Sequence, residues 1–129
     1  MNYNLFYQSV GKLLYAIANA DGKIMPQEKQ RIRQLIDDEL VKIETSTDRF
    51  GTDNAYHAEF AFDYAEENFL NPDKAFLAFE KYLHEHKTVL SPELKQLVYR
   101  LAEKTGEAYK GINEDERNYI DKLKKLLEV

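Results

Sequence analysis

The sequence predicts an all-α domain, and three observations support this prediction. Apolar residues recur three and four positions apart through every long segment, which is the period of an amphipathic helix. Each of the three prolines stands where a helix can begin, because the first helical position does not need the N–H that proline lacks. Alternating apolar and polar runs between hairpin turns are absent from the sequence. We therefore expect a bundle of about six to seven helices.

The first two helices are expected at residues 4–20 and 26–43. An apolar stripe predicts the buried face of the first: Leu5, Phe6, Val10, Leu13, Leu14 and Ile17. Gly22 is placed to end this helix, because glycine readily adopts the left-handed conformation that follows a helix C-terminus. Pro26 opens the second helix, whose inward residues are expected to be Ile32, Leu35, Ile36 and Leu40.

Four more helices are expected after a polar loop at residues 44–52. They are predicted at residues 53–70, 72–87, 92–105 and from 114 onward. Asn71 and Ser91 each precede a proline and are typical N-cap residues. Asn113, with Glu116 three residues later, forms the pattern of a capping box at the start of the last helix.

Two distant segments share a residue pattern, which predicts an internal pseudo-twofold repeat. The two copies read Ile24-x-x-x-Glu28-x-x-x-Ile32-x-x-Leu35 and Ile112-x-x-x-Glu116-x-x-x-Ile120-x-x-Leu123, each with a glycine upstream. The preceding segments also match, as Leu13-Leu14-Tyr15-x-Ile17-Ala18 and Leu97-Val98-Tyr99-x-Leu101-Ala102. We expect one domain over residues 1–129, with repeat halves at about 5–43 and 91–128 and central helices at about 53–87.

Composition excludes several classes of function. The chain has 18 basic and 23 acidic residues, a net charge of −5 and a pI near 5.2, which disfavours nucleic-acid binding. It has no cysteine, so thiol catalysis, disulfides and cysteine metal sites are excluded. Residues 1–4 lack the features of a secretory signal, and no apolar run is long enough to span a bilayer. These features favour a cytoplasmic protein.

The segment from Asp21 to Glu28 is the main candidate binding site. Five residues fit positions 3, 5, 6, 8 and 12 of a calcium-binding EF-hand loop: Asn19, Asp21, Gly22, Ile24 and Glu28. The fit fails at position 1, where Ile17 cannot supply the carboxylate that calcium needs. A structural reading also accounts for the motif. In that reading Gly22 forms a turn, Asp21 accepts a backbone N–H, and Glu28 faces the positive end of a helix.

The pattern Ala18-x-Ala20-Asp21-Gly22-x-Ile24-x-x-x-Glu28 after an apolar helix resembles the tellurite-resistance TerB-like family, over nearly the whole chain. The resemblance implies two helix-loop-helix pairs packed around a central helical pair, in a bacterial cytoplasmic protein. It also implies a stress-response role, protein partners in a peripheral membrane complex, and divalent-cation binding through acidic motif residues. Those residues fall on Asp21, Glu28 and Glu116. The second copy departs from the pattern, because Lys110 rather than an aspartate precedes Gly111.

The helix expected at residues 53–70 has an unusual charge pattern, because it contains no Lys or Arg. Three acids recur at every fourth position: Glu59, Asp63 and Glu67. Like charges at this spacing cost a few tenths of a kcal/mol per pair. A solvated face, Arg31 and Arg33 of the second helix, a cation, or a basic protein partner would each accommodate the acids. We name these three acids, with the loop at residues 44–52, as the candidate partner surface.

Two further patterns were considered as sites. Glu80 and His84 are spaced to share a metal ion, but a zinc site needs three or four ligands. Eight aromatic residues predict the packing surface between the third and fourth helices: Tyr56, Phe60, Phe62, Tyr64, Phe69, Phe76, Phe79 and Tyr82. The sequence contains neither a nucleophile elbow nor a phosphate-binding glycine pattern.

These observations lead to two functional hypotheses of different classes. The first is a non-enzymatic TerB-like protein-interaction or scaffold domain with a protein partner. The alternative is a divalent metal-ion binder or sensor that uses Asp21 and Glu28, together with Glu116. An enzyme ranks third, because the sequence offers no coherent acid–base or nucleophile set.

Overall fold

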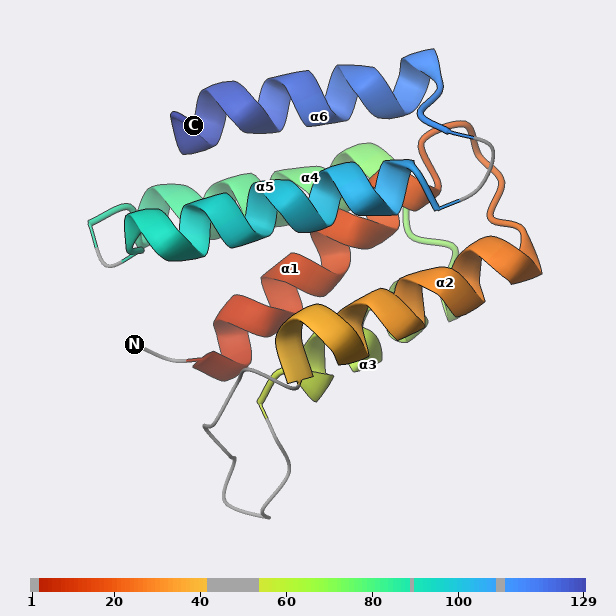
Figure 1. Ribbon diagram of the computed structural model, residues 1–129, viewed down its shortest axis with the longest axis horizontal. Helices are drawn as coiled ribbons and strands as arrows, with labels where there is room; N and C mark the ends of the chain where they lie inside the picture. The colour runs from red at the N-terminus through yellow and green to blue at the C-terminus, as the bar shows by residue number, and fades with distance from the viewer. Residues whose placement is uncertain (1–2, 42–53, 89, 109–110) are drawn as a thin grey trace.

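The computed structural model describes residues 3–41, 54–88, 90–108 and 111–129, and this part of the chain is entirely helical (Figure 1). It contains the helices α1 (Tyr3–Ala18), α2 (Pro26–Ile36), α3 (Tyr56–Glu67), α4 (Pro72–Glu85), α5 (Pro92–Gly106) and α6 (Glu114–Leu127). A π-helical turn, η1 (Asp37–Val41), continues α2. The described residues include no strand, so the all-α prediction is confirmed. Within the same ranges, no helix combines the length and the apolar character needed to cross a membrane.

The helix starts obey the capping rules that the sequence predicts. The side-chain oxygen of Asn71 accepts hydrogen bonds from the backbone N–H groups of Asp73 at 2.8 Å and Lys74 at 3.2 Å. The Ser91 hydroxyl accepts one from the N–H of Leu94 at 3.2 Å. These bonds satisfy donors that have no partner within the helix, which fixes the first turns of α4 and α5.

The second helix differs from its prediction, because regular α-helix ends at Ile36 and η1 carries the chain to Val41. The acidic run in η1 lies at a helix C-terminus, where the helix dipole disfavours anions. Glu39 is compensated across the fold, since Arg100 of α5 lies 3.3 Å from its carboxylate and Lys104 forms a second ion pair. The bond to Lys104 is the main cause that lowers the pKa of Glu39.

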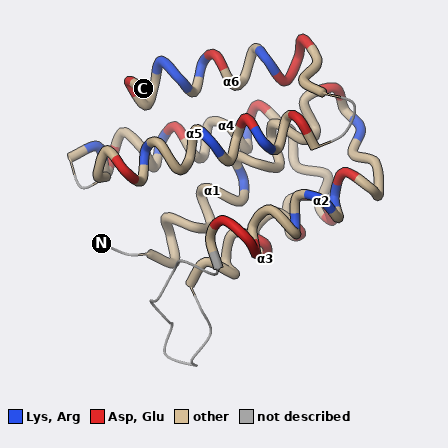
Figure 2. The backbone as a smooth tube through the Cα atoms, viewed as in Figure 1, with Lys and Arg blue, Asp and Glu red and all other residues tan. Residues whose placement is uncertain are grey.

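The central helix is α1. It passes between α4, α5 and α6 on one side and α2 and α3 on the other (Figure 1), and it contacts α3, α4, α5 and α6. Its only charged residue is Lys12, and Figure 2 shows how little charge this helix carries. The TerB-like resemblance implies a central helical pair instead. In the described residues, α3 and α4 pack mainly on α1 rather than on each other.

The eight aromatic residues do not form the packing surface between α3 and α4 that the sequence predicts. Phe62 of α3 packs edge-to-face on Tyr15 of α1, with ring centroids 5.8 Å apart. Phe76 of α4 packs on Tyr119 of α6, at 5.2 Å. Three members of the set are exposed instead, by 52%, 64% and 90%: Phe60, Tyr64 and Phe69. The prediction fails because α1 takes the inward surfaces of both helices, which leaves a further face of α3 uncovered.

The helices α1 and α3 come unusually close at Gly11. A Cβ at this position would lie 2.2 Å from the carbonyl oxygen of Ala58 and 3.0 Å from the Cβ of Ala61. About two turns nearer the start of α1, the Asn4 amide nitrogen lies 3.2 Å from Nε2 of His57. Contacts between the beginnings of both helices mean that α1 and α3 run in the same direction. Glycine at the crossing therefore sets the separation of the two helices.

Candidate functional site

The candidate motif and its second copy meet at one pocket. The loops that precede α2 and α6 both turn at a left-handed glycine, with φ of +85° at Gly22 and +81° at Gly111. The prediction of a glycine turn at Gly22 is confirmed. The pocket has a volume of about 330 Å³ and is lined by Asp21, Lys23, Met25, Glu28, Gly111, Asn113 and Glu116. All three predicted metal ligands are therefore among its lining residues.

Glu28 and Glu116 each hold the start of a helix. Oε1 of Glu28 accepts a hydrogen bond from the N–H of Met25 at 3.2 Å. Oε1 of Glu116 accepts one from the N–H of Asn113 at 2.9 Å, and Asn113 accepts in return from the N–H of Glu116 at 2.8 Å. The capping box at Asn113 is thus confirmed. The matching bond at Met25 was missed because methionine is not an N-cap residue, although the three-residue spacing to Glu28 signalled it.

Burial makes these two carboxyl groups unusual. Glu28 is only 5% exposed and Glu116 only 3%. Burial is the main cause that raises the pKa of Glu116, to about 7, and the charges of Glu28 and Asp21 add to it, while the bond from Asn113 opposes it. Burial likewise raises the pKa of Glu28, with a smaller contribution from Asp21. Glu116 is therefore partly protonated near neutral pH, and its titration is coupled to that of Glu28.

Backbone hydrogen bonds engage all three carboxylates of the pocket. Oδ1 of Asp21 accepts a hydrogen bond from the N–H of Lys23 at 3.1 Å, which is the turn role that the sequence predicts. Each of the three acids is thus bonded to backbone. Across the described ranges, no three His, Asp or Glu side chains are arranged to hold a metal ion. Ile17, at the first position of the EF-hand match, is fully buried.

The other metal candidate, Glu80 with His84, gains no third His, Asp or Glu ligand among the described residues. Glu80 of α4 forms an ion pair with Lys122 of α6, at 3.6 Å. His84, one turn further along α4, is exposed. The ion pair gives Glu80 a role in joining α4 to α6.

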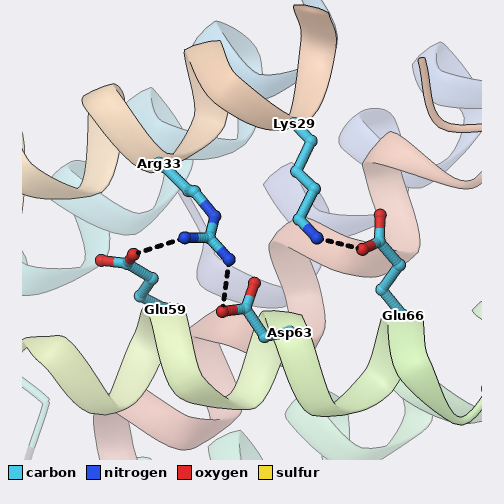
Figure 3. Close-up of polar contacts among 5 residues, drawn as sticks. All are labelled: Lys29, Arg33, Glu59, Asp63 and Glu66. Carbon is cyan, nitrogen blue, oxygen red and sulfur yellow. Dashed lines mark hydrogen bonds and ion pairs between the residues drawn. The ribbon is translucent and has the colours of Figure 1, made fainter. Parts of the chain in front are cut away.

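Two of the three acids named as a partner surface face α2 (Figure 3). Nη1 of Arg33 lies 3.3 Å from Oε1 of Glu59, and Nη2 lies 2.6 Å from Oδ2 of Asp63. Lys29, one turn earlier in α2, pairs with Glu66. Compensation of the α3 acids by Arg33 is therefore confirmed. One guanidinium that bridges two carboxylates fixes the angle between the helices more firmly than a single pair would.

The remaining acid and the remaining arginine of this prediction lie elsewhere. Glu67 is exposed, whereas Arg31 lines a separate surface pocket with Leu35 and Lys104. Burial is the main cause that raises the pKa of Glu59. The positive charge of Arg33 acts in the opposite direction and lowers this pKa. The loop at residues 44–52, the other part of the predicted partner surface, lies outside the described residues.

A separate face of α3 is aromatic and exposed. It borders a surface groove of about 400 Å³ between α1 and α3, lined by Gln8, Lys12, His57, Phe60, Ala61 and Tyr64. The His57 and Phe60 rings meet edge-to-face, with centroids 5.6 Å apart, and Tyr56 stacks on Phe60 at 6.4 Å. Sequence reasoning missed this groove because it assigned the aromatics to the core. The spacing of Phe60 and Tyr64, on a different face from buried Phe62, was the available signal.

The end of α3 carries an exposed aromatic residue in a strained conformation. Phe69 is 90% exposed and has a φ of +51°. The N–H of Leu70 bonds to the carbonyl of Ala65 at 3.0 Å, and that of Phe69 bonds to Glu66 at 3.2 Å. These two bonds form a Schellman motif, whose left-handed position favours glycine by about 1 kcal/mol over residues with a Cβ.

No protein-family model, curated protein or solved structure matches the chain.

Proposed function

We propose that the chain is a non-enzymatic, TerB-like protein-interaction domain and that a protein partner docks on the aromatic face of α3. The observation that carries this proposal is the exposure of Phe60 and Tyr64, at 52% and 64%, one turn apart beside a groove. Large aromatic side chains bury 150–250 Å² each and dominate the binding energy of many interfaces. Two such side chains beside a groove offer an anchor for a partner.

Two of the acids predicted to form the partner surface are already engaged within the protein, which favours the aromatic face of α3 as the docking site. Glu59 and Asp63 already bond to Arg33, so a basic partner would have to compete with that guanidinium. The aromatic side chains of α3 require no such exchange. Strained, exposed Phe69 adds a second candidate anchor, because strain that is retained at a surface position is often linked to function.

The TerB-like part of the proposal has structural support of its own. The two loops that share a sequence pattern both contain a left-handed glycine, at Gly22 and Gly111. In both, a buried glutamate bonds to the N–H three residues earlier, from Glu28 to Met25 and from Glu116 to Asn113. These likenesses are what an internal pseudo-twofold repeat would produce.

The proposal can be tested by affinity purification of binding partners from a lysate of the source organism. The bait would be the wild type, the Phe60→Ser/Tyr64→Ser double variant, or the control Leu77→Ser, which alters an apolar side chain of α4 that is 59% exposed. Mass spectrometry should find a partner that the double variant loses and the control retains, while circular dichroism shows that all three are folded. A partner retained by the double variant would refute docking on α3.

The second candidate function is divalent-cation binding at the pocket between the two loops. It is favoured by one observation: three carboxylates line this pocket, and the charges of two of them help to raise the pKa of Glu116. A bound cation would remove that repulsion. Calorimetry at pH 8 with calcium, magnesium and zinc should give binding heat that Asp21→Asn/Glu28→Gln abolishes. A silent titration of the wild type would refute this function.

A further inference from the structure

The groove between α1 and α3 differs in charge from the rest of the molecule. The chain carries a net charge of −5, yet no acidic residue is among those that line the groove. Lys12 lines it, and no carboxylate in the described part of the chain pairs with this amine. An unpaired cation beside exposed aromatic rings is the arrangement that recognises a carboxylate next to an apolar group.

Two of the acids on the same helix already have a cation partner. Glu59 and Asp63 lie on the face of α3 that meets α2, where Arg33 holds both carboxylates (Figure 3). The groove-facing residues of α3 are instead Phe60 and Tyr64, with uncharged Ala61 between them. Among the described residues that line the groove, Lys12 is therefore the one Lys, Arg, Asp or Glu.

The shape of the groove favours one kind of occupant. Two parallel helices that touch at Gly11 diverge at the surface into a shallow trough of about 400 Å³. A trough with an aromatic wall on one side and a polar wall, formed by Gln8 and Lys12, on the other suits an amphipathic helix, whose apolar stripe and charged edge lie side by side.

We infer that this groove binds an acidic amphipathic helix of the protein partner. An apolar side chain of that helix packs on Phe60 and Tyr64, and a carboxylate at the edge of its apolar stripe pairs with Lys12. This inference rests on the proposed function, because it names the chemistry of the partner that docks on the aromatic face of α3. It does not depend on the pocket lined by Glu28 and Glu116.

The test uses two synthetic helical peptides with the same leucine and phenylalanine stripe. One carries glutamate along the edges of that stripe and the other carries lysine. Each is titrated into the isotope-labelled full chain and followed by NMR. The glutamate peptide should shift signals of Lys12, Phe60 and Tyr64, and it should bind about fivefold more tightly than the lysine peptide, the ratio that ~1 kcal/mol from one exposed ion pair gives.

Two charge-reversal variants make the test specific. Lys12→Glu should invert the preference, so that the lysine peptide becomes the tighter ligand. Lys124→Glu, at an exposed position on α6, changes the net charge equally and should leave the preference unchanged. Inversion counts only where the variant keeps the dispersed spectrum of a folded chain and the shifts map to Phe60 and Tyr64, because an unfolded acidic chain would also attract the lysine peptide.

Each other outcome contradicts a different statement. Equal binding of both peptides in the groove, or no inversion in Lys12→Glu, would overturn the acidic specificity and leave docking on α3 intact. No binding, or shifts confined to other helices, would overturn the docking surface itself. A dimer in sedimentation equilibrium that is lost in Phe60→Ser/Tyr64→Ser would identify a second copy of the chain as the occupant and overturn the inference.

Discussion

Replacing Gly11 by alanine should destabilise the protein by about 1–2 kcal/mol net, although alanine is the better helix former. The added Cβ would lie 2.2 Å from the carbonyl oxygen of Ala58, and real Cβ contacts below 3.0 Å are essentially never seen. The obstructing atom belongs to the backbone of α3, so it cannot rotate away. To relieve the overlap, α1 and α3 must separate by roughly an ångström along a tightly packed interface.

Two opposing terms set the size of this effect. Alanine at a helix interior gains up to about 1 kcal/mol over glycine. Overpacking of a core that cannot relax costs about 1–3 kcal/mol, and more when backbone must move. The second term should win, because the clash involves both the carbonyl oxygen and the carbonyl carbon of Ala58, the latter at 2.9 Å.

The assay is urea unfolding followed by circular dichroism, with Gly106→Ala as the matched control. Gly106 is also a buried helical glycine, but a Cβ there would meet only the side chains of Ile120 and Ile112, at 3.0 and 3.1 Å. Those side chains can shift by a few tenths of an ångström, so the control should lose at least about 1 kcal/mol less than Gly11→Ala. If Gly11→Ala equals the wild type in stability, the close contact does not set the helix separation, and the reasoning fails.

Three further predictions follow from the pocket, the ion pairs and the end of α3. Because the folded-state pKa of Glu116 lies near 7, above the usual 4.5, the stability that its protonated form provides is full below pH 4.5 and lost as the pH rises through 7. Glu116→Gln keeps the capping acceptor, so it should raise the free energy of unfolding by about 1–3 kcal/mol at pH 8.5 and change it little at pH 4.5. The control Glu114→Gln, at an exposed position, should show no such pH dependence. Equal effects of the two variants would contradict this prediction. Arg33→Ala should lower stability at pH 7 by about 1 kcal/mol and raise the pKa of Glu59 further, as carbon-detected NMR titration would measure; an unchanged pKa would refute the pairing. Phe69→Gly should raise stability by about 0.5–1 kcal/mol in thermal unfolding, and a loss would show that the ring makes stabilising contacts.

Local features of the fold were predictable because their causes lie within a few residues. Pro26, Pro72 and Pro92 begin helices as expected, because a fixed φ and a missing N–H suit the first helical position. Gly22 has the expected left-handed conformation, and Asp21 accepts the expected backbone bond. Each of these depends on sequence neighbours alone.

Features that depend on which helix lies beside which were not predictable. Helical period showed that α3 has apolar positions on more than one face, but it could not tell which face α1 would cover. Phe62 is buried and Phe60 is exposed for that reason alone. Likewise, the pocket needs α2 and α6 to begin side by side, and no spacing within the sequence indicates that Glu28 and Glu116 approach each other.

The position of α1 has a consequence for the order in which the chain can fold during synthesis. This helix leaves the ribosome before the α3, α4, α5 and α6 helices that it contacts. Until they follow, a helix whose single charge is Lys12 lacks the helices that bury its apolar surface in the folded state. Contacts of such long sequence separation form slowly and leave a nascent chain open to aggregation or chaperone capture. Burial of α1 therefore depends on helices drawn from most of the remaining described chain, which ties those helices into the same folding step.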